Sequence, residues 1–130
     1  MIIDDIVAAF AEVEGWWNLD PTVIPRRANN PMDLIFEYQN GATISSEYGS
    51  NPRTFAVWPT PQGGIVGAYR QVLAWTSLDL TLTQMIVHQD PGNPTYLSSM
   101  KSLLPHIDFD AQIKTLIPPL IRPGGPEGSV

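Results

Sequence analysis

The chain has 130 residues, 43% of them hydrophobic and 15% charged, with a formal net charge of −6. This size and composition suit one globular domain and exclude an intrinsically disordered chain. The acidic balance argues against a nucleic-acid partner, which needs a basic face, and the lack of cysteine excludes disulfides and thiolate metal sites.

The N-terminal stretch MIIDDIVAAF carries acids where a secretory signal peptide carries positive charge, so we predict no export signal. No apolar run approaches the roughly 18 residues that would suggest a membrane span. The sequence leaves open whether the protein is cytoplasmic, associated with a virion or exported by a non-classical route. It also leaves the oligomeric state undetermined.

The first predicted element is a helix that ends at Gly15. Its apolar residues recur at helical spacing, and glycine is a natural helix stop. They are Ile3, Ile6, Val7, Phe10 and Val13. The segment 16–31 then reads as a loop, because it contains Pro21 and Pro25 and ends in the Asn29-Asn30-Pro31 turn signal.

A small three-stranded antiparallel sheet is predicted between residues 34 and 58. Apolar and polar residues alternate over 34–38, as in a half-buried strand. Asn40-Gly41 is the dipeptide that two-residue hairpin turns prefer, because both central residues need positive φ. A return strand over 43–47 and a third strand over 54–58 complete the predicted sheet.

Several short helices are predicted to follow. Thr60-Pro61 indicates an N-cap with proline in the first turn. Gly63, Gly64 and Gly67 weaken this helix by roughly 1 kcal/mol each relative to alanine. We therefore expect another helix or a ligand to approach its backbone closely.

Thr81 to Gln84 has capping-box spacing and predicts the next helix. Asn93-Pro94 predicts another helix, and Asp108 caps a last short one. We expect residues 1–117 to form one α+β domain. The Pro/Gly-rich tail, 118–130, is expected to fray or to reach a partner.

Glu14 stands out because it lies on the apolar face of the first predicted helix, whereas Glu12 lies on the opposite, solvated face. Burial and the helix dipole both disfavour a negative charge at this helix end, so both should raise the pKa of Glu14. A carboxyl that stays protonated near neutral pH can act as a general acid. Alternatively, Glu14 bends to water or pairs with Arg26 or Arg27.

Four stretches of the sequence carry motifs in a familiar order. They are AEVEGW (11–16), PRRANNPMDL (25–34), TFAVWPTPQGGIVGAYRQVL (54–73) and LTLTQMIVHQDPGNPTYLSSM (80–100). In this order they resemble a lysozyme-like domain of phage and bacterial muramidases and lytic transglycosylases. The resemblance covers residues 3 to 107. It implies a small antiparallel sheet beside a helical lobe, with a sugar cleft between them.

The resemblance also implies an activity, the cleavage of a peptidoglycan glycan strand. The catalytic acid of the family is the glutamate at the end of the first helix, which matches Glu14. A second carboxylate is needed in many glycosidases, and Asp33, Glu37 and Glu47 are the candidates on the predicted sheet. In the transglycosylase variant, one glutamate acts as acid and then as base, and we favour this version.

Sugar binding needs aromatic faces and planar amides. Trp16, Trp17 and Trp58 are candidates for stacking on sugar rings, with core packing as the competing role. Asn29 and Asn30 are candidates for hydrogen bonds to sugar hydroxyls. The resemblance adds two further aromatic residues of the cleft, Tyr69 and Tyr96.

We predict no metal site and no cofactor, because His88 and His106 lack neighbours at ligand spacing and no nucleotide motif is present. The sequence departs from the family pattern where Met32 replaces a glycine and Asp33 replaces an asparagine. Met32 would strain the turn or block the sugar. This departure and the acidic charge leave two other hypotheses, an inactive lysozyme-like module with a glycan-binding or structural role and an intracellular globular domain.

Overall fold

The computed structural model describes residues 1–18, 20 and 22–118. In this part the chain forms helices and irregular segments. The helices are α1 (Ile2–Glu14), α2 (Ile24–Arg27), η1 (Phe36–Tyr38), η2 (Ser46–Tyr48), α3 (Pro61–Trp75), α4 (Leu82–Gln89), α5 (Tyr96–Leu103) and α6 (Ile113–Leu116), where η denotes a 3-10 helix. Apart from Pro118, the predicted tail lies outside the described residues.

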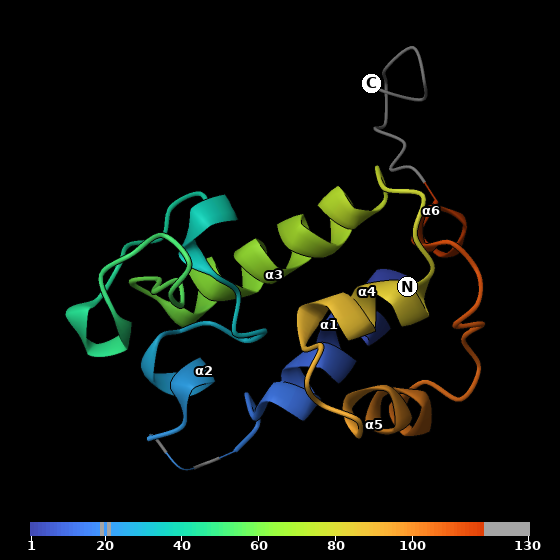
Figure 1. Cartoon of the computed structure of the whole chain (residues 1–130), viewed down its shortest axis with the longest axis horizontal. Helices are drawn as coiled ribbons and strands as arrows, with labels where there is room; N and C mark the ends of the chain where they lie inside the picture. The colour runs from blue at the N-terminus through green and yellow to red at the C-terminus, as the bar shows by residue number, and fades with distance from the viewer. Residues whose placement is uncertain (19, 21, 119–130) are drawn as a thin grey trace.

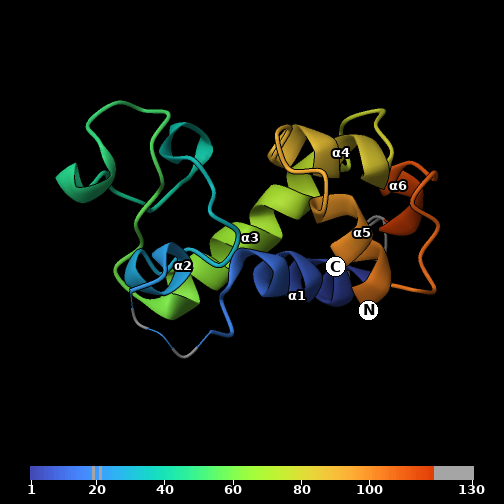
Figure 2. The ribbon, with the colours of Figure 1, turned by 60° about the horizontal axis from the view of Figure 1, so that its bottom comes forward.

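The helix α3 spans the molecule and joins two lobes (Figures 1 and 2). The irregular segment 28–60, which includes η1 and η2, lies at the start of α3 and is called the irregular lobe. The helices α4, α5 and α6 lie at its far end, and α1 packs against both α3 and α5. None of the helices in the described ranges has the length and apolar character that a membrane crossing requires.

The predicted three-stranded sheet, and with it the α+β class, is wrong. The described residues contain no β-strand, and segments 34–58 meet only at isolated antiparallel bridges, Ile35 with Phe55 and Thr43 with Val57. Both bridges involve the third segment, so the first two segments do not form the hairpin expected at Asn40-Gly41.

The alternating pattern fails because this region has no continuous face to bury. Leu34 is buried, but Tyr38 is 66% exposed and residues 36–38 turn into η1. Short strands need a buried face or several partners to be stable. Gly41 does adopt the positive φ expected of it, 75°, but it joins segments that do not pair with each other.

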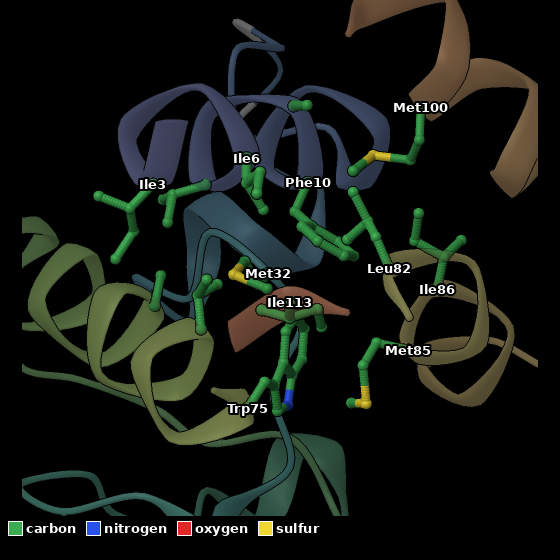
Figure 3. Packing of buried hydrophobic residues seen from close by; sticks show 14 of the residues in the cluster. Ile3, Ile6, Phe10, Met32, Trp75, Leu82, Met85, Ile86, Met100 and Ile113 are labelled. Atoms are coloured by element: carbon green, nitrogen blue, oxygen red, sulfur yellow. The ribbon is translucent and has the colours of Figure 1, made fainter. Parts of the chain in front are cut away.

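The core lies between α1, α3, α4, α5 and α6 (Figure 3). Phe10 of α1 is fully buried and packs edge-on against Trp75, with ring centroids 5.4 Å apart. Tyr96 of α5 lies on another side of Phe10, at 6.0 Å. The irregular lobe contributes Met32, which is also fully buried. The α1 face predicted to be apolar is therefore the face that packs into the core.

The helix ends follow the predicted caps in α1, α3 and α4. Gly15 ends α1 with φ 96°, and the Thr60 hydroxyl accepts a hydrogen bond from Gly63 N at the start of α3. Thr81 and Gln84 form the predicted capping box. The helix α5 begins at Tyr96, after Asn93-Pro94, and α6 begins after Gln112 rather than at Asp108.

The glycines of α3 allow the irregular lobe to approach the helix. A Cβ atom at Gly64 would lie 1.7 Å from the Asn29 carbonyl oxygen, and one at Gly67 would lie 2.4 Å from the Trp58 ring. The predicted close approach is therefore confirmed. The approaching group is neither a helix nor a ligand but the segment 28–60 of the same chain.

Candidate active site

Glu14 is the last residue of α1, and its side chain is partly buried. The left-handed Gly15 turns the chain away at this point, so the carboxyl stays at the end of the helix. Three polar groups from other segments influence its pKa, namely Asp33, Tyr96 and Asp90. The site is therefore assembled from α1, the irregular lobe and the region that leads into α5.

Asp33 is carried by a turn that Asn30 holds in place. The Asn30 side chain is fully buried, and its amide nitrogen donates to the carbonyl oxygens of Leu34 and Ala56, each at 2.9 Å. Its amide oxygen accepts a hydrogen bond from Leu34 N at 2.9 Å. Asp33 itself has a left-handed backbone, with φ 52°. These contacts fix the turn 30–34 beside the end of α1.

Burial, and next the negative charge of Asp33, raise the pKa of Glu14 to about 8. Burial also raises the pKa of Asp33, to about 6. The pKa of the Tyr96 hydroxyl is raised as well, first by burial and then by the charge of Glu14. The rise for Glu14 has the direction predicted from the sequence. Near neutral pH the arrangement retains a proton at Glu14, beside an ionised Asp33.

Two buried polar atoms near Glu14 lack hydrogen-bond partners among the described residues. Asp33 Oδ1 and Tyr96 Oη are buried and have no hydrogen-bond partner of good geometry among the described residues. Buried polar atoms usually have partners, and those that lack them often have a functional role. The cluster of Glu14, Asp33 and Tyr96 is thus the strongest candidate for a reaction centre.

The alternative role of Glu14, an ion pair with a neighbouring arginine, does not occur among the described residues. The Arg26 guanidinium lies over the Trp16 ring, 4.7 Å from its centroid. Arg27 pairs with Glu47 instead. Neither arginine therefore neutralises Glu14.

The remaining predicted residues occupy several places. Trp16 and Trp58 are buried, whereas Trp17 is 53% exposed and lies on the outer side of α1. Tyr69 donates a hydrogen bond to Asp4, at the opposite end of α1 from Glu14. Glu37 pairs with Arg53 at 3.0 Å on the irregular lobe. Of the predicted residues, the structure brings Asp33 and Tyr96 to Glu14.

The amides predicted to bind sugar are already engaged within the protein. Asn29 donates from its side chain to the Trp58 carbonyl oxygen at 2.9 Å, and Asn30 makes the three hydrogen bonds described above. Both residues connect the turn 28–34 to the segment 56–58. Their amide groups therefore hold the site in shape.

Met32 neither strains the turn nor blocks the site. The positive φ values of this turn fall on Asn29, at 51°, and on Asp33, at 52°. The Met32 side chain is fully buried and points into the core (Figure 3). Core packing therefore accommodates the methionine at this position.

Asp90 is a residue near the site that was not among the residues predicted from the sequence. It lies at the end of α4, and its charge also raises the pKa of Glu14. Asp90 and Tyr96 line a hollow of about 310 Å³, together with the turn 91–94 and apolar residues of α4 and α5.

Replacing Asn30 with alanine is expected to lower the free energy of unfolding by about 2–3 kcal/mol, because Leu34 N loses its buried partner. Urea denaturation of both proteins measures this loss. Asn40→Ala is the matched control, since the Asn40 side chain is exposed, and should change stability by less than about 0.5 kcal/mol. Equal stability of the two variants would contradict the role assigned to Asn30.

The free energy of unfolding is expected to fall as the pH rises from 5 to 8. In the unfolded chain Glu14 and Asp33 ionise near 4.5 and 3.8, whereas folding raises both pKa values. In this window the folded protein holds protons that the unfolded chain has released, so rising pH favours unfolding. Urea midpoints at several pH values measure the slope.

Glu14→Gln should remove most of that slope, because glutamine does not ionise. Glu12→Gln, on the exposed face of the same helix, is the matched control and should retain it. If wild type and Glu14→Gln depend equally on pH, Glu14 is not the group that holds the proton.

Within the described ranges, no three histidine, aspartate or glutamate side chains are grouped so that they could hold a metal ion.

Comparison of the chain with protein-family models, with curated proteins and with solved structures finds no match.

Proposed function

We propose that the chain is a lysozyme-like domain that cleaves the glycan strand of peptidoglycan, with Glu14 as the general acid. The observation that carries this proposal is the position of Glu14 at the end of α1, partly buried beside the unpartnered buried polar atoms of Asp33 and Tyr96, where burial raises its pKa to about 8. A general acid works best when its pKa lies near the working pH. The motifs that resemble lysozyme-like domains place the catalytic acid of that group at the same residue.

Asp33 is assigned a positioning role rather than that of a second catalytic carboxylate. Carboxyls that flank a glycosidic bond are about 5–9.5 Å apart, which leaves space for a sugar or a water molecule. After burial, the charge of Asp33 is the largest cause of the raised pKa of Glu14. Asp33 therefore acts by keeping Glu14 protonated, and the one-glutamate mechanism needs no second carboxylate at such a separation.

The mechanism that fits this arrangement uses one glutamate twice. The Glu14 carboxyl gives its proton to the glycosidic oxygen as the bond to the anomeric carbon breaks. The resulting carboxylate then takes a proton from a hydroxyl of the same sugar, and that oxygen bonds to the anomeric carbon. The products are a shortened strand and a fragment that ends in an anhydro ring.

Incubation of the protein with purified peptidoglycan, followed by mass analysis of the released fragments, tests this function. We expect soluble muropeptides with anhydro ends, each lighter by one water molecule than a hydrolysis product. Fragments with reducing ends would mean that another group activates water, and would overturn the one-glutamate mechanism. No release from several wall types would overturn the enzymatic proposal.

A second candidate function is a lysozyme-like module without catalytic activity, which binds glycan or has a structural role in a virion or secretion apparatus. Two observations favour it, the net charge of −6 and the engagement of Asn29 and Asn30 within the fold. Co-sedimentation with insoluble peptidoglycan, without any release of fragments, would select this function over the first.

A further inference from the structure

A groove with a volume of about 370 Å³ runs along the outer side of α1, away from the Glu14 site. We call it the outer groove, and it is lined by Asp5, Ala8, Ala9 and Glu12 of α1, by Trp17 and by the segment 103–107. Residues two apart on a helix differ in direction by about 200°. Glu12 and Glu14 therefore point to nearly opposite sides of α1.

The outer groove has an apolar floor and apolar walls. Ala9 and Leu104 are buried, and the small Ala8 side chain leaves space above the helix. Trp17 is 53% exposed and Leu103 is 44% exposed, although both side chains are large and apolar. The other three tryptophans of the chain are buried, so Trp17 is the exception. A half-exposed aromatic in a groove is typical of a surface that contacts a partner.

Two carboxylates stand on this surface, and His106 is the other titratable side chain that lines the groove. Asp5 and Glu12 are seven residues apart on α1, which places them on the same face about 10 Å from each other. Neither forms an ion pair or a side-chain hydrogen bond with another described residue, whereas Glu37, Glu47 and Asp79 each pair with a cation. The groove thus combines apolar contact area with two carboxylates that form no ion pair with a described residue.

We propose that the outer groove binds a basic, apolar peptide segment of a partner protein. In the polyproline II conformation each residue adds about 3.1 Å and every third side chain lies on the same side, so two lysines or arginines three positions apart match the spacing of Asp5 and Glu12. The apolar residues between them would lie over Ala8 and beside Leu103. A cation near Trp17 gains a further contribution from the face of the indole ring.

Charge complementarity also selects the type of partner. The chain carries a net charge of −6, so a second copy would bring repulsion rather than compensation to this groove. A partner segment with the sequence pattern Lys-Leu-Leu-Lys supplies both the charge and the apolar surface. This interaction does not depend on Glu14 or on cleavage of glycan.

Protection of Trp17 from acrylamide quenching tests the proposal. The protein is titrated at low salt with an eight-residue peptide that contains Lys-Leu-Leu-Lys. We expect the peptide to reduce the quenchable part of the tryptophan fluorescence, because Trp17 is the tryptophan most open to solvent. Peptides with Glu-Leu-Leu-Glu or Lys-Ser-Ser-Lys at the same positions should bind at least tenfold more weakly.

Two double variants separate the groove from the overall charge. Asp5→Asn/Glu12→Gln is expected to weaken peptide binding at least tenfold. Asp79→Asn/Asp110→Asn changes the net charge equally at exposed positions outside the groove, and should bind within twofold of wild type. Equal binding by the two double variants would overturn the proposal, as would equal binding of the serine peptide.

The oligomeric state of the protein in the absence of peptide provides an independent check of the proposal. Sedimentation at increasing concentration is expected to give a monomer whose Trp17 remains quenchable. A dimer in which Trp17 is protected would assign the outer groove to a second copy and overturn the proposed partner. Because Glu14→Gln leaves this groove untouched, that variant should bind the peptide as wild type does, whatever its effect on glycan cleavage.

Discussion

Glu14→Gln is expected to reduce the release of muropeptides from peptidoglycan by a factor of about 10² to 10⁴ while the fold survives. Glutamine has nearly the same shape but carries no proton that it can give to the glycosidic oxygen, and general acid catalysis contributes a factor of this size. Initial rates of release at pH 6, with equal amounts of folded protein, measure the effect. Far-UV circular dichroism shows whether the helices remain.

Two other substitutions, Glu12→Gln and Asp33→Asn, are to be measured beside Glu14→Gln. Glu12→Gln, on the exposed face of α1, should release fragments at the wild-type rate. Asp33→Asn removes the charge that, after burial, contributes most to the raised pKa of Glu14. Its activity should therefore decline at a lower pH than that of wild type, which is expected to decline as the pH passes about 8. Undiminished release by Glu14→Gln would exclude Glu14 as the acid.

Gly64→Ala is expected to have the largest effect on stability, a loss of about 3 kcal/mol or more. The added Cβ atom would lie 1.7 Å from the Asn29 carbonyl oxygen, which is a backbone atom fixed within the turn that leads to Asp33. The helix and the turn must separate to admit it, and overpacking of this kind costs 1–3 kcal/mol or more. The gain in helix propensity, about 1 kcal/mol, has the opposite sign and is smaller.

Thermal and urea denaturation of the purified variant measure this loss. Gly92→Ala is the matched control, because a Cβ atom at Gly92 has no neighbour within 4 Å. That control should stay within about 0.5 kcal/mol of wild type. A Gly64→Ala protein as stable as wild type would mean that α3 and the irregular lobe can move apart at little cost.

The helical part of the fold could be predicted from the sequence because its signals are local. The apolar residues of α1 recur at helical spacing, Gly15 ends that helix, and Thr81 with Gln84 caps α4. Each signal depends on residues within one or two turns of a helix. For the same reason Glu14 could be recognised as an acid on the apolar side of a helix end.

The sheet and the neighbours of Glu14 could not be predicted in this way, because they depend on distant contacts. Alternation over 34–38 predicts a strand only if a partner buries one face, and no such partner covers Tyr38. Asp33 reaches Glu14 because Asn30 bonds to Ala56, 26 positions along the chain. The candidate list contained Asp33 and Tyr96, but no local pattern distinguished them from Glu37 or Tyr69.

The irregular lobe is joined by isolated bridges rather than by strands, so part of it should open without global unfolding. Between residues 36 and 54 only a minority of the backbone N–H groups donate to another backbone group, so the remaining amide hydrogens there should exchange through small openings rather than through global unfolding. The turn 30–34 differs, because the buried Asn30 ties it to Ala56 and Asn29 ties it to Trp58. Opening of the outer part of the lobe therefore leaves Asp33 beside Glu14, and the environment of the acid is uncoupled from the least stable segment of the chain.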